Sequence, residues 1–424
     1  MIQPPAPASM SSPDANLNAL ASDFDPSNLR GTTLGRYELL ALIGKGGMAS
    51  VWVARDTTGK HDKPVAIKVI REELAREPKA RTMFLVEGAV VAGIRHPHVV
   101  RVFEVSQSAG ILYMVMEWVE GAALHALISE ANKRRAIPAE HAVRLIADTA
   151  GGLHAAHEMK DQKGVARNLV HCDMSPQNIL VGLDGTVKLV DFGVASTVGR
   201  VGADGAPFVR GKVGYMSPEQ TRAEVLDRRS DIFSLGIVLF ELTTGFRLFR
   251  GKDSRHTIEL VRQARIPRPT QIMNGYPKEL EAVVLKALQR DLSLRFQSAD
   301  EFKNALEQYL RSERIVVPPA GVGGLVKRVL GGRIEHHRTL IRDAVAALDA
   351  GPEARERWLA EPQAPPPKDA GTVTVTTSAS PVPRPSLPPP PPPPKRPFMS
   401  RSQLNWALWL MFMAAGTVFA WWLH

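Results

Sequence analysis

Apolar residues recur in short runs in the first part of the chain and in longer helical patterns further on. Short apolar or alternating runs bounded by Gly, Asp or Pro are typical of strands. Five such runs occur, at 37–43, 50–55, 65–70, 99–105 and 111–117. A helix-like stretch between the third and fourth runs covers 81–94. The pattern therefore predicts a small antiparallel sheet with one helix.

Helical periodicity dominates further along the chain. Residues 137–159 carry apolar side chains at helical spacing, and Pro138 is expected at the first helical position. Similar patterns predict helices at 231–245 and 277–289, and a basic amphipathic stretch at 324–350 predicts one or two more. The expected fold class is therefore α+β, with a sheet-based lobe followed by a mainly helical lobe.

Both ends of the chain have compositions unlike that of a folded domain. Residues 1–33 are rich in Ser, Pro, Asn and Asp and lack the basic start and apolar core of a signal peptide, so we expect a disordered leader. Residues 362–403 are expected to be a proline-rich linker, with a polyproline II rod of about 20 Å at its seven consecutive prolines. Between them we expect one folded domain, 34–312, and a basic amphipathic helical segment, 313–361.

The C-terminal segment has the length and composition of a membrane span. The 18 residues from Trp406 to Leu423 carry no charge and would form a helix of about 27 Å, close to the thickness of a hydrocarbon core. Three basic residues flank its N-terminal side: Lys395, Arg396 and Arg401. We therefore expect a transmembrane helix at 404–423 that contacts lipid, a single-pass C-terminal anchor in the cytoplasmic (inner) membrane, with the folded domain in the cytoplasm. Gly416 and Ala420 leave open either a homodimer or a coincidental lipid-facing pair.

Cysteine usage and charge narrow the function further. The single cysteine excludes a disulfide framework and a Cys-based zinc cluster, which agrees with a cytoplasmic domain. The formal net charge of +10 is spread along the chain and forms no Lys/Arg stripe with interleaved aromatic residues. We therefore expect no nucleic-acid partner.

Two motifs in the sheet region are suited to holding phosphates. The segment from Gly44 to Val51 is glycine-rich and links two expected strands, so its backbone N–H groups can approach a phosphate closely. Lys68 follows it on an apolar strand, where an unpaired ammonium would be costly. The expected anionic partner is Glu87, on the helix-like stretch that follows.

The remaining chemistry lies further along the chain. Asp173 and Asn178 lie in the segment from His171 to Asn178, and Asp191 follows them in an Asp-Phe-Gly motif. Phosphoryl transfer from ATP requires a lysine on the phosphates, two oxygen donors for Mg²⁺, and an acid that orients the attacking hydroxyl. All of these groups are present, in one order along the chain, and their conjunction is far more specific than any single motif.

Over Leu34 to Ser312 the sequence resembles the eukaryotic-like (Hanks-type) serine/threonine protein kinases of bacteria. The likeness extends to the segments 96–100, 116–121 and 214–219, and to Asp231 and Arg295. It implies a two-lobed protein kinase fold that transfers the γ-phosphate of ATP to Ser/Thr hydroxyls of cytoplasmic proteins. The implied cofactors are ATP and Mg²⁺, with Mn²⁺ as a substitute.

The resemblance also implies a role for each matching residue. Lys68 pairs with Glu87 and the ATP phosphates, Asp173 is the catalytic base, and Asn178 and Asp191 hold Mg²⁺. Met116 is the gatekeeper, the backbone of Glu117 and Val119 binds adenine, and Glu219 pairs with Arg295. The residues implied to surround ATP are Ile43, Gly44, Lys45, Gly46, Gly47, Met48, Ala49, Ser50, Val51, Ala66, Lys68, Met116, Glu117 and Val119.

Four positions depart from the family pattern. Ala49 replaces the third glycine of the loop, which a negative φ would tolerate. Cys172 replaces the arginine that receives an activation-loop phosphate, and Lys212 replaces a usual threonine, so we expect activity without phosphorylation of Ser196 or Thr197. Ser175 replaces the lysine that neutralises γ-phosphate charge, which predicts slow catalysis and removes one marker of Ser/Thr preference.

Several residues carry a second interpretation. The retained catalytic groups favour a kinase, while Cys172 and Ser175 leave a membrane-tethered pseudokinase as the alternative, acting as a nucleotide- or partner-binding scaffold. Cys172 is interpreted as an inert residue rather than a redox sensor, and His154 and His157 as packing residues rather than metal ligands. His171 is expected to pack under the catalytic loop. Six linker hydroxyl residues are either autophosphorylation sites or a solvated tract: Thr372, Thr374, Thr376, Thr377, Ser378 and Ser380.

Overall fold

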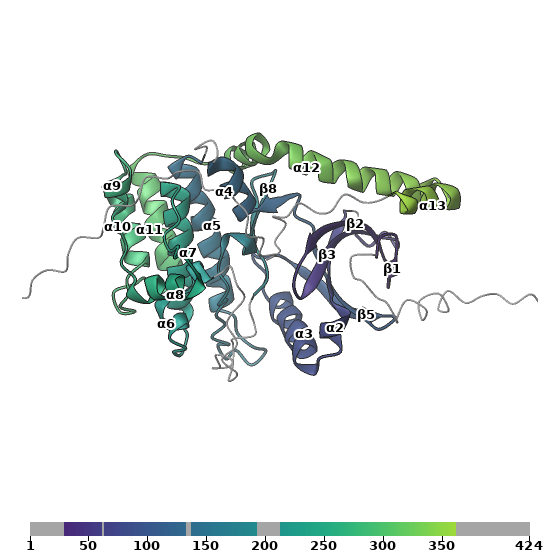
Figure 1. Ribbon diagram of the computed structural model, residues 1–424, viewed down its shortest axis with the longest axis horizontal. Helices are drawn as coiled ribbons and strands as arrows, with labels where there is room; N and C mark the ends of the chain where they lie inside the picture. The colour runs from purple at the N-terminus through teal and green to yellow at the C-terminus, as the bar shows by residue number, and fades with distance from the viewer. Residues whose placement is uncertain (1–28, 62, 133–136, 193–212, 362–424) are drawn as a thin grey trace, which may run out of the picture. The chain divides into compact units, whose positions relative to one another are not determined.

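The computed structural model describes residues 29–61, 63–132, 137–192 and 213–361. They form a sheet-based lobe and a helical lobe (Figure 1). The expected α+β arrangement of two lobes is confirmed.

A six-stranded antiparallel sheet forms the first lobe, with strand order β1-β2-β3-β4-β6-β5. Its strands are β1 (Thr33–Leu34), β2 (Tyr37–Lys45), β3 (Ala49–Asp56), β4 (Val65–Ile70), β5 (Val102–Ser108) and β6 (Ile111–Glu117). The short helix α2 (Glu72–Ala75) leads into α3 (Pro78–Ala92), which packs against β5. The five expected strands and the expected helix are all present, and the two-residue β1 and the four-residue α2 are additional.

Strand β5 begins at Val102, later than the expected run, because Val99 and Val100 pair with the helical lobe. Val100 N donates to Leu189 O at 2.9 Å, and Val99 forms a parallel bridge to the same residue in the helical lobe. These two valines therefore link the lobes instead of extending the sheet.

Helices form most of the second lobe. They are α4 (Leu124–Asn132), α5 (Ala139–His157), α6 (Pro218–Thr221), α7 (Arg228–Thr244), α8 (Ser254–Gln263), α9 (Pro269–Ile272), α10 (Lys278–Ala287) and α11 (Ala299–Ser312). From Ser230 to Thr244 every residue of α7 is buried, as expected of a helix at the centre of a core, and α5 and α11 pack beside it. Pro138 is the N-cap of α5 and not its first helical residue.

A second, three-stranded sheet lies next to the segments that carry Asn178 and Asp191. Its strands are β7 (Gly121–Ala123), β8 (Ile179–Gly182) and β9 (Val187–Leu189). The 3₁₀ turn η2 (Pro176–Asn178) leads directly into β8, and Asp191 follows β9. Strands of three or four residues are too short to show periodicity, so the sequence pattern did not predict this sheet.

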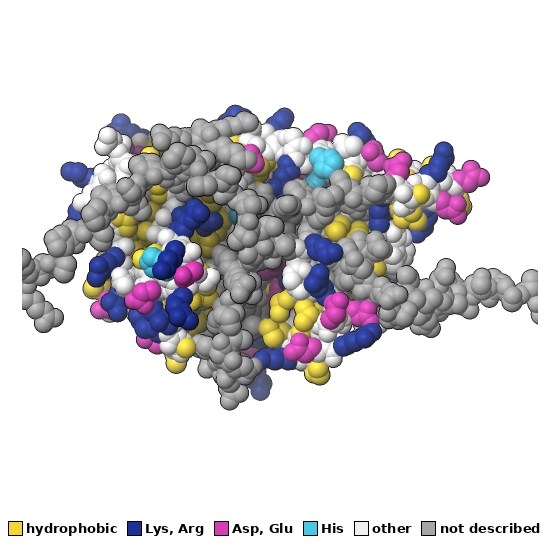
Figure 2. Space-filling model, viewed as in Figure 1, with side chains coloured by type: hydrophobic (Ala, Val, Ile, Leu, Met, Phe, Trp, Pro, Cys, Tyr) yellow, Lys and Arg dark blue, Asp and Glu magenta, His cyan; other side chains and the backbone are white. Residues whose placement is uncertain are grey.

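Two further helices follow α11 and pack on both lobes. They are α12 (Pro319–Asp349) and α13 (Pro352–Ala360), which lie along the upper edge in Figure 1. In the space-filling view this edge carries many charged side chains (Figure 2). The first residues of the described chain pack on the sheet lobe. Leu29 is only 3% exposed in the core cluster of the sheet, and Gly31 N donates to Leu39 O at 2.8 Å, so residues 29–33 are part of the fold and not of the expected leader.

Other expectations lie outside the described residues. They concern the leader before residue 29, the residues Ser196, Thr197 and Lys212, the linker with its hydroxyl residues, and the segment 404–423 with Gly416 and Ala420. Among the helices that the structure does describe, none is both long enough and apolar enough to cross a membrane.

Candidate active site

Lys68 lies in β4, and two carboxylates hold its ammonium. Lys68 Nζ lies 2.9 Å from Glu87 Oε1 on α3 and 2.9 Å from Asp191 Oδ1. Burial alone would lower the pKa of this ammonium, but attraction by Asp191 and Glu87 outweighs burial and raises the pKa. The expected pairing with Glu87 is therefore confirmed, and Lys68 is charged at neutral pH.

Negative charge exceeds positive charge around this lysine. Burial raises the pKa of the Glu87 carboxyl; Lys68 opposes this effect, while Asp191 and Asp173 add to it. One ammonium thus contacts two carboxyl groups, and the charge of a third, Asp173, acts on Glu87. A divalent cation bound beside Asp191 would offset the excess.

Asn178 and Asp191 supply oxygen atoms of the kind that Mg²⁺ prefers. Asn178 Nδ2 donates to Asp173 O at 2.8 Å and to Asp173 Oδ2 at 2.9 Å, which leaves the amide oxygen of Asn178 for a cation. No group of three or more His, Cys, Asp or Glu side chains in the described ranges is arranged to hold a metal. Mg²⁺ at phosphate sites needs only one or two side chains besides the phosphates, so this pair fits it.

The backbone of the catalytic loop is held by a buried aspartate on α7. Asp231 accepts hydrogen bonds from His171 N at 2.7 Å and Cys172 N at 2.8 Å, and its Oδ2 lies 2.8 Å from His157 Nε2. Gln220 Nε2 donates to Cys172 O at 2.7 Å from the other side. These contacts fix Cys172 at a φ of +62°, which a non-glycine side chain adopts only at a cost.

His171 and His157, both expected to be packing residues, lie beside the catalytic loop. His171 is fully buried, its ring lies 4.6 Å from that of Phe192, and its Nε2 contacts Val190 O at 3.2 Å. His157 is also fully buried and contacts Asp231. The expected packing role of His171 is confirmed. His157 does more than pack, because it contacts Asp231, which supports the catalytic loop; the sequence pattern missed this contact.

Neighbouring strands gather the residues expected around ATP. β2 carries Ile43, Gly44 and Lys45, the following turn Gly46, Gly47 and Met48, β3 Ala49, Ser50 and Val51, β4 Ala66 and Lys68, and β6 Met116 and Glu117, with Val119 after it. The strand register pairs Val51 with Lys68 and Ala66 with Met116. Ala49 is not among the residues with positive φ, and Ala49 O accepts from Gly46 N at 2.7 Å, so the alanine fits the tight loop.

The backbone N–H of Glu117 is occupied by the sheet. It donates to Arg101 O at 2.9 Å, so the backbone of Glu117 can offer a nucleotide only its carbonyl oxygen. The Glu117 side chain accepts from Lys188 Nζ at 2.6 Å and from Arg101 N at 2.7 Å. This ion pair ties the hinge between the lobes to β9, a link that the sequence pattern did not indicate.

Ser175 occupies a buried position in the catalytic loop. Its side chain is almost fully enclosed, and its Oγ donates to Gln177 Oε1 at 3.0 Å. The hydroxyl therefore supplies no positive charge where the resemblance expects a lysine. Because Asp231 and Gln220 hold Cys172 through its backbone, the loss of the arginine side chain at that position does not remove those contacts.

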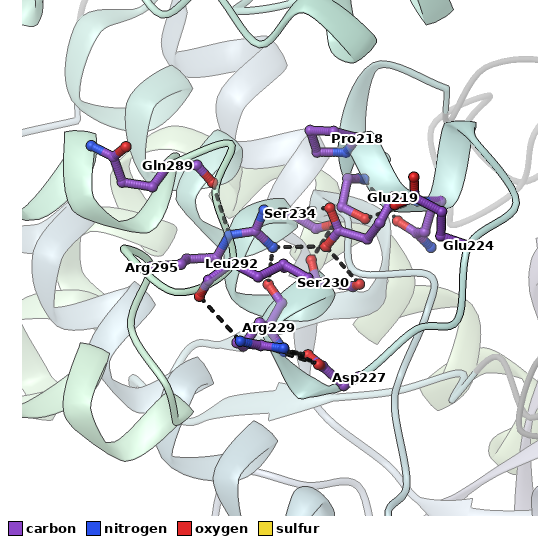
Figure 3. A network of polar contacts seen from close by, with 12 residues as sticks. Pro218, Glu219, Glu224, Asp227, Arg229, Ser230, Ser234, Gln289, Leu292 and Arg295 are labelled. Carbon is purple, nitrogen blue, oxygen red and sulfur yellow. Dashed lines mark hydrogen bonds and ion pairs between the residues drawn. The ribbon is translucent and has the colours of Figure 1, made fainter. Parts of the chain in front are cut away.

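A buried ion pair joins the segments of the helical lobe (Figure 3). Arg295 Nη1 lies 2.7 Å from Glu219 Oε1 and 2.6 Å from Arg229 O, and Ser230 Oγ also donates to Glu219 Oε1 at 2.8 Å. Burial of the Glu219 carboxyl would raise its pKa, but the hydrogen bond and charge of Arg295 outweigh burial and lower it. The expected pairing of Glu219 with Arg295 is confirmed.

Comparison with known proteins identifies the family from this geometry and sequence. A family model described as "Protein kinase domain" matches residues 37–309. The tyrosine-protein kinase MasK of Myxococcus xanthus is 34% identical over 65% of this chain and 43% of its own length. The serine/threonine-protein kinase PknB of Mycobacterium leprae is 37% identical over 63% of this chain and 42% of its own length. The match therefore spans about two fifths of each of these curated relatives.

A solved structure has the same fold. A double mutant of the PknI kinase domain of Mycobacterium tuberculosis is 25% identical, covers 66% of this chain and 97% of that chain, and superimposes with a TM-score of 0.51. The family match ends at residue 309, so α12 and α13 lie outside the shared domain.

Proposed function

Because the chain belongs to the protein kinase family, we propose that it transfers the γ-phosphate of ATP to Ser/Thr hydroxyls of cytoplasmic proteins. The observation that carries the proposal is Lys68, held 2.9 Å from both Glu87 and Asp191 across the lobe junction. Relatives from this family include a bacterial serine/threonine kinase, which supports the choice of acceptor.

Each retained side chain has a role that its geometry permits. Lys68 would bind the α- and β-phosphates, with Glu87 and Asp191 fixing the direction of its ammonium. Asn178 and Asp191 would hold Mg²⁺, which offsets charge on the phosphates when bound. Asp173, oriented by Asn178, would accept a hydrogen bond from the acceptor hydroxyl and receive its proton.

We propose that activation-loop phosphorylation is not required for this activity. The catalytic loop is held by Asp231 and Gln220 through the backbone of Cys172, and it has no arginine at that position to bind a phosphate. This support for the loop is independent of any phosphorylated residue.

A pseudokinase is the second candidate, because Ser175 supports it directly. The buried hydroxyl is bonded to Gln177 and offers no charge to a γ-phosphate. The kinase relative MasK is named a tyrosine kinase, so the acceptor residue must also be measured.

The decisive experiment follows labelled phosphate from ATP, with Mg²⁺ and then Mn²⁺, in the full-length chain and a generic protein substrate. We expect label on Ser and Thr in acid hydrolysates and its loss in Lys68→Met, with Lys60→Met, at an exposed position outside the site, as a charge-matched comparison. Label on Tyr alone would overturn the proposed acceptor. A wild-type chain that binds nucleotide and transfers nothing with either metal would establish the pseudokinase.

We also propose that residues 404–423 anchor the kinase to the cytoplasmic (inner) membrane. The support is the uncharged length of that segment, its tryptophans and the basic residues that precede it. The kinase domain would then act on substrates at the cytoplasmic face of the membrane.

A further inference from the structure

Helix α12 belongs to the cores of both lobes. It is one helix of 31 residues, about 46 Å long. In its first half Val322, Val326 and Leu330 are almost fully buried in the largest hydrophobic core. On the helical-lobe side, α12 contacts α4, α5, β7 and β8. In its second half Ala344 is fully buried against Leu40 and Val53 of the sheet lobe. A continuous helix is stiff, so it restricts how far the two lobes can move apart.

Close contact fixes the first half of the helix on the helical lobe. A Cβ at Gly323 would lie 2.2 Å from Leu183 O, and a Cβ at Gly185 would lie 1.9 Å from Pro319 O. Only glycines permit this approach, and Gly185 also has a φ of +84°. The turn between β8 and β9, which precedes Asp191, is therefore packed directly against the start of α12.

The middle of the helix contacts the hinge between the lobes. Trp118 packs against the largest core and also against the smaller cluster that joins Ala344 of α12 to Leu40 and Val53 of the sheet. Arg338 binds Glu120 through two nitrogens, with Nη2 3.1 Å from Oε2. Ile43, next to the glycine-rich loop, packs in the same cluster together with Ile341. The helix thus contacts both the hinge and the strand end that are expected to enclose ATP.

The end of the extension is anchored to the sheet by a buried tryptophan and a charge network. Trp358 on α13 is 6% exposed and packs with Leu40 and Val53. The nearly buried Glu38 on β2 accepts from Arg55 at 2.9 Å and pairs with Arg355 of α13 at 3.3 Å. Without α13 this buried carboxylate would lose one of its two cationic partners.

We propose that α12 and α13 form a brace that positions the nucleotide site, with Trp358 and Arg338 as positioning residues for ATP. The brace rests on the proposed function, because the geometry that it sets is that of the site for ATP. It lies outside the matched kinase domain, which ends at residue 309. If α12 and α13 lose these contacts, a smaller fraction of molecules holds the two lobes in the geometry that binds nucleotide. The apparent affinity for nucleotide then falls by the same factor.

The test uses the full-length chain and measures both Mg²⁺–ADP binding and the KM for ATP. We expect Trp358→Ala to weaken ADP binding and raise the KM for ATP about tenfold, with the KM for protein substrate unchanged and near-normal affinity in Trp358→Phe. Val316→Ala is the matched control, because this side chain is 87% exposed just before α12. Backbone hydrogen exchange should accelerate in 37–56 and 117–121 in Trp358→Ala, and not in Trp358→Phe or Val316→Ala.

A surface charge exchange keeps the test valid if Trp358→Ala does not fold. Arg338→Glu should weaken ADP binding about threefold, since exposed pairs contribute modestly, and the double variant with Glu120→Arg should restore it. Folded variants of both kinds with wild-type ADP affinity and wild-type exchange would overturn the brace. A wild-type chain that binds ADP but transfers no phosphate would contradict the proposed function, while the brace would still be judged by the binding data.

Discussion

At position 175 a serine stands where the resemblance expects a lysine, and we expect this replacement to limit catalysis. Ser175→Lys should raise kcat about tenfold or more, because the long stem can carry an ammonium out of the buried position toward the γ-phosphate. Steady-state rates at saturating ATP measure this effect. Ser175→Met matches the length without the charge and should give no gain, so equal rates for the two variants would argue against a charge effect.

The residues of the site could be predicted well from the sequence because their motifs are local. Lys68 and Glu87 were expected as a pair from one buried cation and one nearby acid, and they are 2.9 Å apart. The supports of the catalytic loop could not be predicted in the same way. The contact of His157 with Asp231 joins positions 74 residues apart, and no periodicity reports such a distance.

At the scale of elements, the ion pair of Arg295 joins the loop before α11 to α6 and α7. Arg295→Leu should lower the free energy of unfolding by about 3–5 kcal/mol, because it leaves the buried Glu219 carboxylate without its cation. Chemical denaturation measures this change. Replacing Glu219 by Leu as well should restore part of the loss.

Arg311→Leu provides the control for that measurement. Arg311 Nη1 lies 3.7 Å from Glu307 Oε2, and the arginine side chain is 67% exposed. Removal of this side chain should therefore change the free energy of unfolding by less than about 0.5 kcal/mol. Equal destabilisation by the two substitutions would show that the buried pair has no special structural role.

Long elements with clear periodicity were predicted correctly, and short or interlobe elements were not. The expected strands at 37–43 and 65–70 correspond to β2 and β4, because their apolar runs fill a buried sheet. β7 to β9 escaped prediction because they have only three or four residues each. The amphipathic stripe of α12 predicted a helix but not its partner, since its two halves bury their apolar side chains in different lobes.

At the scale of the whole molecule, the proposed anchor at 404–423 predicts that the kinase is bound to a membrane. Full-length chain should sediment with membranes and resist extraction by high salt, whereas a chain ending at residue 403 should be released to the soluble fraction. The reason is that about 18 uncharged residues bury enough apolar surface to hold a helix in the bilayer. Recovery of the shortened chain with membranes after a salt wash would contradict the proposed anchor.

The full-length chain is an enzyme, and substitution of Asp173 tests this claim most directly. We would measure the initial rate of phosphate transfer with Mg²⁺–ATP beside the affinity for Mg²⁺–ADP. The exposed Glu313→Gln, placed after α11, serves as a matched loss of one carboxylate. Asp173→Asn should lower kcat by about 10²- to 10⁴-fold with little change in ADP affinity, and Glu313→Gln should change neither. Transfer by Asp173→Asn at the wild-type rate, or a wild-type chain that binds ADP and transfers nothing, would contradict the claim.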